Sequence, residues 1–157
     1  MKIELWYIGK TSFAYLKEGE DLYEKRIKRY LPFQKHMIPD IKNAKNMGAV
    51  QLKEKEGNVV LDKLKSDDCL ILLDENGKHY TSVEFSSLLE SKMQSSHKRL
   101  IFLIGGAFGF SDTVYRRANF KISLSKMTFS HQMIRIFALE QFYRALTIMK
   151  NEPYHNN

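Results

Sequence analysis

The sequence is poor in residues that form disulfides or bind metals. It has one cysteine, Cys69, so no disulfide can form within the chain. Because Cys69 lies in the apolar run 69–73, we expect a buried and unreactive thiol. The five histidines lack the close Cys/His spacing that zinc sites use. The sequence therefore predicts no metal site.

Long apolar runs are also absent. No stretch approaches the roughly 20 apolar residues that a membrane-spanning helix needs. The first ten residues, MKIELWYIGK, contain neither the apolar centre nor the small-residue cleavage site of a signal peptide. These absences predict a protein that contacts no membrane and stays in the cytoplasm.

Proline and glycine are scarce, and no repeat or low-complexity linker divides the chain. Hydrophobic residues make up 43% of the 157 residues, which is enough to bury one substantial core. We therefore expect one domain over residues 1–157.

Positive charge exceeds negative charge, and the excess lies at both ends of the chain. The formal net charge is +7. Residues 1–65 hold 14 Lys/Arg against 9 Asp/Glu, residues 66–110 hold 4 against 6, and residues 111–157 hold 7 against 3. This distribution is typical of an RNA-binding surface made from both terminal regions. It is equally typical of a solvated, lysine-rich helical face.

Strand patterns and helix patterns alternate along the chain. Strands are predicted at 2–8, 33–38, 69–73, 100–104 and 120–124. Helices are predicted at 13–31, at 47–64, after a Thr81–Glu84 capping box until Ser95, from Ser111 through Asn119, and at 134–149. The alternation predicts an α/β domain with a mainly parallel sheet and helices on both faces.

Two polar segments are predicted to be exposed to solvent or to form a turn. Residues 53–57 (Lys-Glu-Lys-Glu-Gly) lie inside the second predicted helix and are expected to form a solvated face. Residues 74–77 (Asp-Glu-Asn-Gly) follow a wholly apolar strand and are expected to form a turn.

In a parallel sheet, ligands bind at the carboxyl ends of the strands, which directs attention to the residues after Leu73, Ile104 and Leu124. The second of these segments, Gly105-Gly106-Ala107-Phe108-Gly109, is neither a GxGxxG dinucleotide motif nor a GxxxxGK[ST] phosphate loop. A nicotinamide-dependent dehydrogenase and a P-loop nucleotidase are therefore disfavoured. Taken alone, this glycine-rich segment is more typical of a turn than of a cofactor site.

Five collinear motifs give the chain a specific resemblance. They are Leu72-Leu73-Asp74, the stretch Ile104 to Gly109, the stretch Leu124 to Arg135 (LSKMTFSHQMIR), the stretch Glu140 to Ala145 (EQFYRA), and the tail Pro153-Tyr154-His155. In order and spacing they resemble the RlmH family of SPOUT methyltransferases over essentially the whole chain. The resemblance implies a SPOUT α/β-knot fold with a C-terminal trefoil knot, a homodimer, and S-adenosylmethionine held in bent form by the knot loops.

The resemblance also implies a substrate and site residues. The implied reaction methylates N3 of a pseudouridine in helix 69 of 23S rRNA within assembled ribosomes. The residues implied to bind the cofactor are Leu73, Gly105, Leu124, Ser125, Lys126, Met127, Thr128 and Phe129. Three residues are implied to handle the substrate. The implied role of His155 is to accept a proton or to orient the substrate, and that of Tyr154 is to stack or to form a hydrogen bond. The implied role of Arg144 is electrostatic, toward the RNA or the nucleobase.

Simpler interpretations stand beside these assignments. Without the resemblance, Tyr154 and His155 read as a frayed tail, and Arg144 reads as the partner of Glu140 in an ion pair within the helix.

Two other functions also remain open: a SPOUT methyltransferase acting on another RNA such as tRNA, and a non-catalytic ribosome-binding module. Saturable binding of S-adenosylmethionine separates an enzyme from a binding module.

Overall fold

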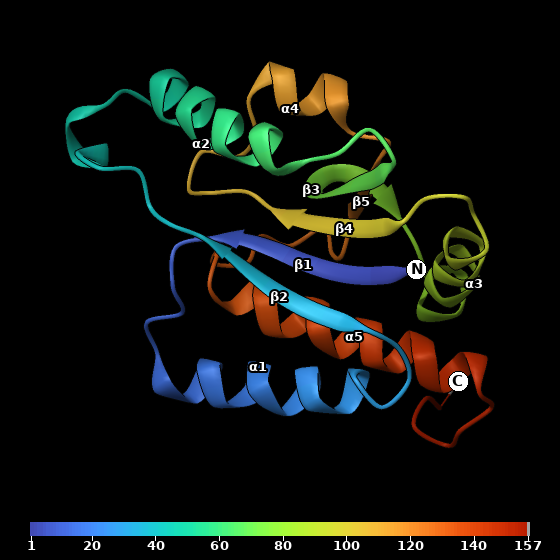
Figure 1. Ribbon diagram of the computed structural model, residues 1–157. Coiled ribbons are helices and arrows are strands. Elements are labelled where there is room, and N and C mark those ends of the chain that lie inside the picture. Colours follow the sequence, from blue (N-terminus) through green and yellow to red (C-terminus); the bar gives the residue numbers. More distant parts are fainter. Residues whose placement is uncertain (157) are drawn as a thin grey trace.

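A five-stranded parallel sheet organises the chain (Figure 1). The computed structural model describes residues 1–156. The strands are β1 (Lys2–Ile8), β2 (Phe33–Ile38), β3 (Asp68–His79), β4 (Arg99–Ile104) and β5 (Phe120–Ser123), in the order β2-β1-β4-β3-β5. Every neighbouring pair is parallel, which confirms the predicted sheet. All five carboxyl ends therefore lie along one edge.

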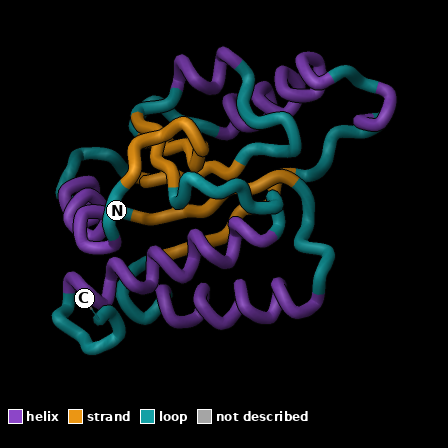
Figure 2. Tube along the Cα trace, turned by 180° about the vertical axis from the view of Figure 1, so that it is seen from behind, coloured by secondary structure: helices purple, strands orange, loops and turns teal. Residues whose placement is uncertain are grey.

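Helices cover both faces of the sheet, as predicted (Figures 1 and 2). The helices are α1 (Ala14–Ile27), α2 (Ala49–Lys63), α3 (Ser82–Met93), α4 (Asp112–Arg117) and α5 (Met133–Met149), with a 3-10 turn at Ala44–Asn46. The first, third and fifth helices pack on one face, and the second and fourth on the other. Within residues 1–156, none of these helices has the length and apolar character to cross a membrane.

Side chains alternate between the two faces of the central strand β4. Leu100, Phe102 and Ile104 join the core beneath α1, α3 and α5, whereas Ile101 and Leu103 join the core beneath α2 and α4. All five are at most 5% exposed. A strand covered on both sides needs apolar residues at every position, which explains its unbroken apolar sequence.

Helix starts follow the predicted capping signals. The Thr81 side chain accepts a hydrogen bond from the Glu84 backbone N–H, and the Glu84 carboxylate accepts one from the Thr81 N–H. The Ser111 hydroxyl accepts from the Val114 N–H at the start of α4. These side chains satisfy backbone donors that have no partner within the helix.

Residues 74–77 do not form the predicted turn. They lie within β3, whose pairing with β5 shifts so that Ile122 pairs first with Leu73 and again with Lys78. A Cβ on Gly77 would lie 2.5 Å from the Ile122 carbonyl carbon, so only glycine fits where the two backbones meet. The irregularity presents Asp74, Glu75 and Asn76 at the carboxyl edge of the sheet.

The predicted solvated face at residues 53–57 is also wrong in part. Glu56 is 8% exposed and Gly57 is buried. A Cβ on Gly57 would lie 2.5 Å from the Ser111 hydroxyl, so the glycine lets α2 approach the start of α4 closely. This packing turns one glutamate of the charged segment inward.

The trefoil knot implied by the resemblance stays a prediction.

Replacing Phe142 with alanine should lower the free energy of unfolding by about 3–5 kcal/mol, because the change opens a cavity where large rings meet. Phe142 is 1% exposed, and its ring centroid lies 4.6 Å from that of Phe102. Urea denaturation at fixed protein concentration measures the loss. Phe108→Ala is the control, since Phe108 is 53% exposed and its removal should change stability by less than about 0.5 kcal/mol.

Candidate functional site

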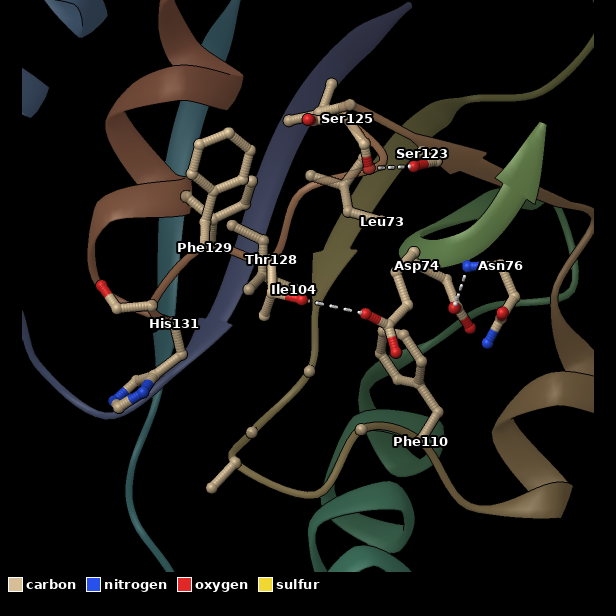
Figure 3. A pocket seen from close by; sticks show the side chains of 18 of the residues that line it. Leu73, Asp74, Asn76, Ile104, Phe110, Ser123, Ser125, Thr128, Phe129 and His131 are labelled. Atoms are coloured by element: carbon tan, nitrogen blue, oxygen red, sulfur yellow. Dashed lines mark hydrogen bonds between the residues drawn. The ribbon is translucent and has the colours of Figure 1, made fainter. Parts of the chain in front are cut away.

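A cavity of about 650 Å³ lies at the carboxyl edge of the sheet (Figure 3). Its walls come from residues 73–76 of β3, residues 104–110 after β4, and residues 123–131 between β5 and α5, except Lys126. Tyr115 and Ile134 complete the lining. The three segments that sequence analysis singled out therefore meet in one cavity, because parallel strands deliver their ends to the same edge.

The structure brings most of the predicted cofactor-binding residues together. Seven of the eight line the cavity, namely Leu73, Gly105, Leu124, Ser125, Met127, Thr128 and Phe129. The eighth, Lys126, is exposed and is not part of the wall. This placement makes the seven residues available to a common ligand. Their role in binding a cofactor stays a prediction.

Glycine keeps the backbone of one wall accessible. A Cβ on Gly105 would lie 3.1 Å from the Phe110 ring, which is tighter than an ordinary contact. Gly109 has φ +81°, a conformation that side chains disfavour, and its N–H donates to the Gly106 carbonyl at 3.1 Å. The sequence therefore gives this loop a tight bend and an open backbone surface.

The opposite wall is acidic. Asp74 accepts hydrogen bonds from the Asn76 backbone N–H at 2.9 Å and from the Tyr115 hydroxyl. Burial and the bond to Asp74 raise the pKa of Tyr115 above its ordinary value, so the phenol stays neutral and donates. Glu75 accepts from the Thr128 hydroxyl at 3.4 Å, between β3 and the loop before α5. The turn-like composition of residues 74–77 hides these carboxylates from sequence patterns, although Asp74 belongs to a motif that carries the family resemblance.

Short contacts shape the loop at residues 123–131. The Ser123 hydroxyl donates to the Ser125 carbonyl at 2.8 Å (Figure 3). The Met127 N–H donates to the Ser125 hydroxyl at 2.9 Å. The ring of Phe129 packs on Phe137 of α5, with centroids 4.7 Å apart. These contacts hold the loop against α5, while Met127 remains 78% exposed.

A buried arginine fixes the end of that loop. Arg135, which is 1% exposed, donates from Nη2 to the Ile8 carbonyl at 2.8 Å, from Nη1 to the Thr11 hydroxyl at 3.0 Å, and from Nε to the His131 carbonyl at 3.1 Å. Its guanidinium lies 4.3 Å from the Tyr7 ring centroid. Burial lowers the pKa of Arg135. The arginine thereby joins the start of α5 to the end of β1.

The three residues implied to handle the substrate form a separate cluster near the C-terminus. Arg144 forms the ion pair with Glu140 that their helical spacing predicts, and its Nε lies 3.1 Å from the Glu140 Oε1. The Arg144 Nη1 lies 3.2 Å from the His155 Nδ1. The Tyr154 hydroxyl donates to the same Glu140 oxygen at 3.1 Å, and its ring meets Tyr143 edge-on. Burial raises the pKa of Tyr154 above its ordinary value. The tail is thus bound to α5 and is not frayed.

This cluster does not meet the cavity within one chain. Ile134 lines the cavity at the start of α5, and Arg144 lies ten residues later on the same helix. At a rise of 1.5 Å per residue, the separation along the helix is about 15 Å. The C-terminus lies at the far end of α5 from the arrowheads of β1 and β4 (Figure 1). The predicted cofactor and catalytic residues therefore occupy opposite ends of α5.

Comparison with known proteins places the chain in a family. The family model described as a predicted SPOUT methyltransferase matches residues 1–155. The chain is 58% identical over 156 residues to a protein of Cytophaga hutchinsonii named ribosomal RNA large subunit methyltransferase H, covering 99% of this chain and 100% of that protein. The protein of the same name from Parabacteroides distasonis is 55% identical, with 99% of each chain covered. The chain belongs to the RlmH family of SPOUT methyltransferases.

The fold of this RlmH-family chain is similar to that of a solved structure. A probable methylase family protein from Haemophilus influenzae superposes with a TM-score of 0.53 at 13% identity, covering 99% of this chain and 70% of that one. At this identity the similarity concerns the fold alone. It supports the arrangement of a parallel sheet between helical layers.

The described part of this RlmH-family chain contains no group of three or more His, Cys, Asp or Glu side chains arranged to hold a metal ion. Cys69 is buried between the strands, and burial raises the pKa of its thiol. The titratable groups on the cavity wall are Asp74, Glu75, Tyr115 and His131. The described cavity wall therefore offers carboxylates, hydroxyls, one imidazole and backbone groups to a ligand.

Replacing Glu140 with alanine should release the tail, because Arg144 and Tyr154 lose their shared acceptor. Amide hydrogen exchange at residues 152–156 should accelerate about tenfold, which corresponds to the roughly 1.5 kcal/mol of one charged hydrogen bond. Mass spectrometry of C-terminal peptides measures the rate. The control is Glu90→Ala, at an exposed position on α3 without an ion pair. Unchanged exchange in the Glu140 variant would show that other contacts order the tail.

Proposed function

We propose that this chain transfers a methyl group from S-adenosylmethionine to N3 of a pseudouridine in helix 69 of 23S rRNA, acting on assembled ribosomes in the cytoplasm. The observation that carries the proposal is the single cavity built from three loops at the carboxyl edge of a SPOUT fold. Full-length similarity to proteins named ribosomal RNA large subunit methyltransferase H supports the RNA target.

The cavity fits the proposed cofactor in charge and in polarity. Leu73, Ile104 and Leu124 offer apolar surface to an adenine ring, and the open backbone of the glycine-rich segment offers donors and acceptors. Asp74 and Glu75 are negative, and no Lys or Arg of the described chain lines the cavity. This wall suits a ligand with net positive charge and disfavours the phosphates of a dinucleotide. When bound, S-adenosylmethionine supplies a methyl group activated by a sulfonium.

The chain's own residues need only align the acceptor and assist loss of the weakly acidic N3 proton. Arginine can only donate hydrogen bonds, so the His155 Nδ1 that faces Arg144 acts as the acceptor. In the tautomer that accepts this bond, the ring proton lies on Nε2. This arrangement favours an orienting role for His155, as a donor to a base carbonyl. Tyr154 offers a ring for stacking, and Arg144 offers charge toward RNA.

A homodimer resolves the separation between the cavity and the C-terminal cluster. In the proposed dimer, the tail of one protomer reaches the cavity of its partner. An exposed apolar surface beside the cavity supports this arrangement: Phe13, Met127, Met133 and Phe137 are 40% to 78% exposed. Hydrogen bonds between Ser12 and Gln132 hold the two parts of this surface together. Exposed clusters of this kind are typical of protein interfaces.

Methylation of ribosomes that lack the helix 69 methyl group tests the whole proposal. Purified protein and S-adenosylmethionine should produce N3-methylated pseudouridine, which mass spectrometry of helix 69 nucleosides detects. Cofactor binding without this product would move the target to another RNA such as tRNA. Absence of cofactor binding in calorimetry would instead favour a non-catalytic ribosome-binding module.

Replacing His155 with alanine should lower kcat roughly 100-fold, because a base that loses this orienting hydrogen bond is misaligned with the methyl donor, and a misplacement of about 1 Å costs about that much. The affinity for S-adenosylmethionine should stay within about twofold, because His155 is proposed to contact the nucleobase and not the cofactor. Steady-state kinetics and calorimetry separate the two effects. Asn156→Ala, at the next and exposed position, is the control and should retain activity. Equal activity in both variants would remove His155 from the mechanism.

Mixed dimers test the shared site directly. Gly105→Leu should fill the cavity, since even a Cβ at this position lies 3.1 Å from the Phe110 ring. Co-expression of Gly105→Leu with His155→Ala places one intact cavity opposite one intact tail. Activity restored in the mixture supports sites shared between protomers. An inactive mixture would mean that each chain uses its own tail.

A further inference from the structure

A buried carboxyl group lies directly behind the glycine loop, which we define as residues 105–109. Glu56 of α2 is 8% exposed. A Cβ on Gly106 would lie 2.7 and 2.8 Å from its Oε2 and Oε1, so the carboxyl group occupies the space that a side chain at 106 would need. Gly106 also lines the cavity. One residue thus separates the Glu56 carboxyl group from the cavity.

The surroundings of Glu56 do not stabilise a negative charge. Among residues 1–156, no group donates a hydrogen bond to its carboxyl oxygens and no cation forms an ion pair with them, so the little solvent that reaches this 8% exposed side chain is their only polar contact. The adjoining gap of about 10 Å³ is at the lower limit of the roughly 10–15 Å³ that one water needs. An ionised carboxylate without partners is costly to bury. Such a group beside a cavity is a candidate for a functional role.

The neighbouring charged groups come from two elements. Lys53 of α2 lines the same gap without pairing with Glu56, and Asp40 follows β2. The strands β1 and β4 and the helix α4 present Ile8, Leu103 and Val114, none of which titrates. Burial first, and then the charge of Asp40, raise the pKa of Glu56 to about 7. Near neutral pH the side chain is therefore divided between its neutral and ionised forms.

We propose that Glu56 is a positioning residue whose neutral carboxyl group holds the glycine loop in the conformation that binds the cofactor. The proposal rests on the cofactor assigned above. The neutral group can pack against the Gly106 backbone with the little solvation that this position allows. The ionised group is repelled by Asp40 and needs water, so it displaces the loop that it touches. Glycine at 106 transmits this displacement because no side chain separates the carboxyl group from the backbone.

The sign of the pH dependence follows from the raised pKa. The folded chain holds the Glu56 proton more tightly than the unfolded chain, so stability falls as pH rises from about 4.5 to about 7. Glu56→Gln cannot ionise and should remove this fall. Its shape matches the neutral acid, so the variant should fold and should melt at a higher temperature than the wild type above neutral pH.

Calorimetric titration of S-adenosylmethionine from about pH 6 to pH 8 tests the effect on binding. The wild-type Kd should rise about tenfold, because each pH unit above the pKa lowers the neutral fraction about tenfold. Glu56→Gln should bind as tightly as the wild type does at pH 6, without that rise. The cofactor's amino group titrates in the same pH range and affects both proteins equally. The test is therefore the difference between the Kd profiles of the wild type and of Glu56→Gln. Glu54→Gln, on an exposed position of α2, is the control and should keep the wild-type profile.

Hydrogen exchange without ligand tests the loop separately. After correction for intrinsic rates, exchange at residues 105–110 should accelerate above pH 7 in the wild type and stay constant in Glu56→Gln. Parallel binding profiles in these two proteins would overturn the proposal. If the wild type binds no S-adenosylmethionine at any pH, the proposed function fails and Glu56 loses its role toward the cofactor. Unchanged loop exchange would then also exclude Glu56 as the support of the loop.

Discussion

Burial of a parallel sheet on both faces is the constraint on which this structure depends. Residues 69–73 of β3 and 100–104 of β4 are apolar at successive positions because helices cover each side of the sheet. Polar groups can then meet a ligand only where the strands end. The parallel arrangement brings three of those ends to one edge, and the loops that follow enclose a cavity. The site is therefore a product of strand direction as much as of residue type.

Much of this framework could be predicted from periodicity and capping signals. The apolar runs at 69–73 and 100–104 lie within the central strands, and the Thr81 capping box begins α3. The three loops at the carboxyl edge could be named in advance because a parallel sheet has one such edge. The individual cofactor positions came from resemblance to a family, since no spacing rule connects residues 73, 105 and 124.

Other features depend on contacts that no local pattern encodes. Glu56 lies in a highly charged segment, and it is buried only because Gly57 lets α2 approach Ser111. Asp74 and Glu75 have turn-like composition, yet β5 keeps them within β3 by pairing twice at Ile122. The tail contains residues typical of a frayed end, but Glu140 supplies an acceptor for Arg144 and Tyr154. In each case the decisive partner is distant in sequence or belongs to another element.

The contacts of Arg135 have a consequence for the order in which the molecule is completed during synthesis. Its guanidinium binds the Ile8 carbonyl across 127 positions of sequence, and α5 supplies both the last wall of the cavity and the cover over β1. A nascent chain that ends before Arg135 has all five strands but lacks this clamp. The loop that ends at His131 and the wall that Ile134 provides are therefore held in place only once the final helix has been synthesised.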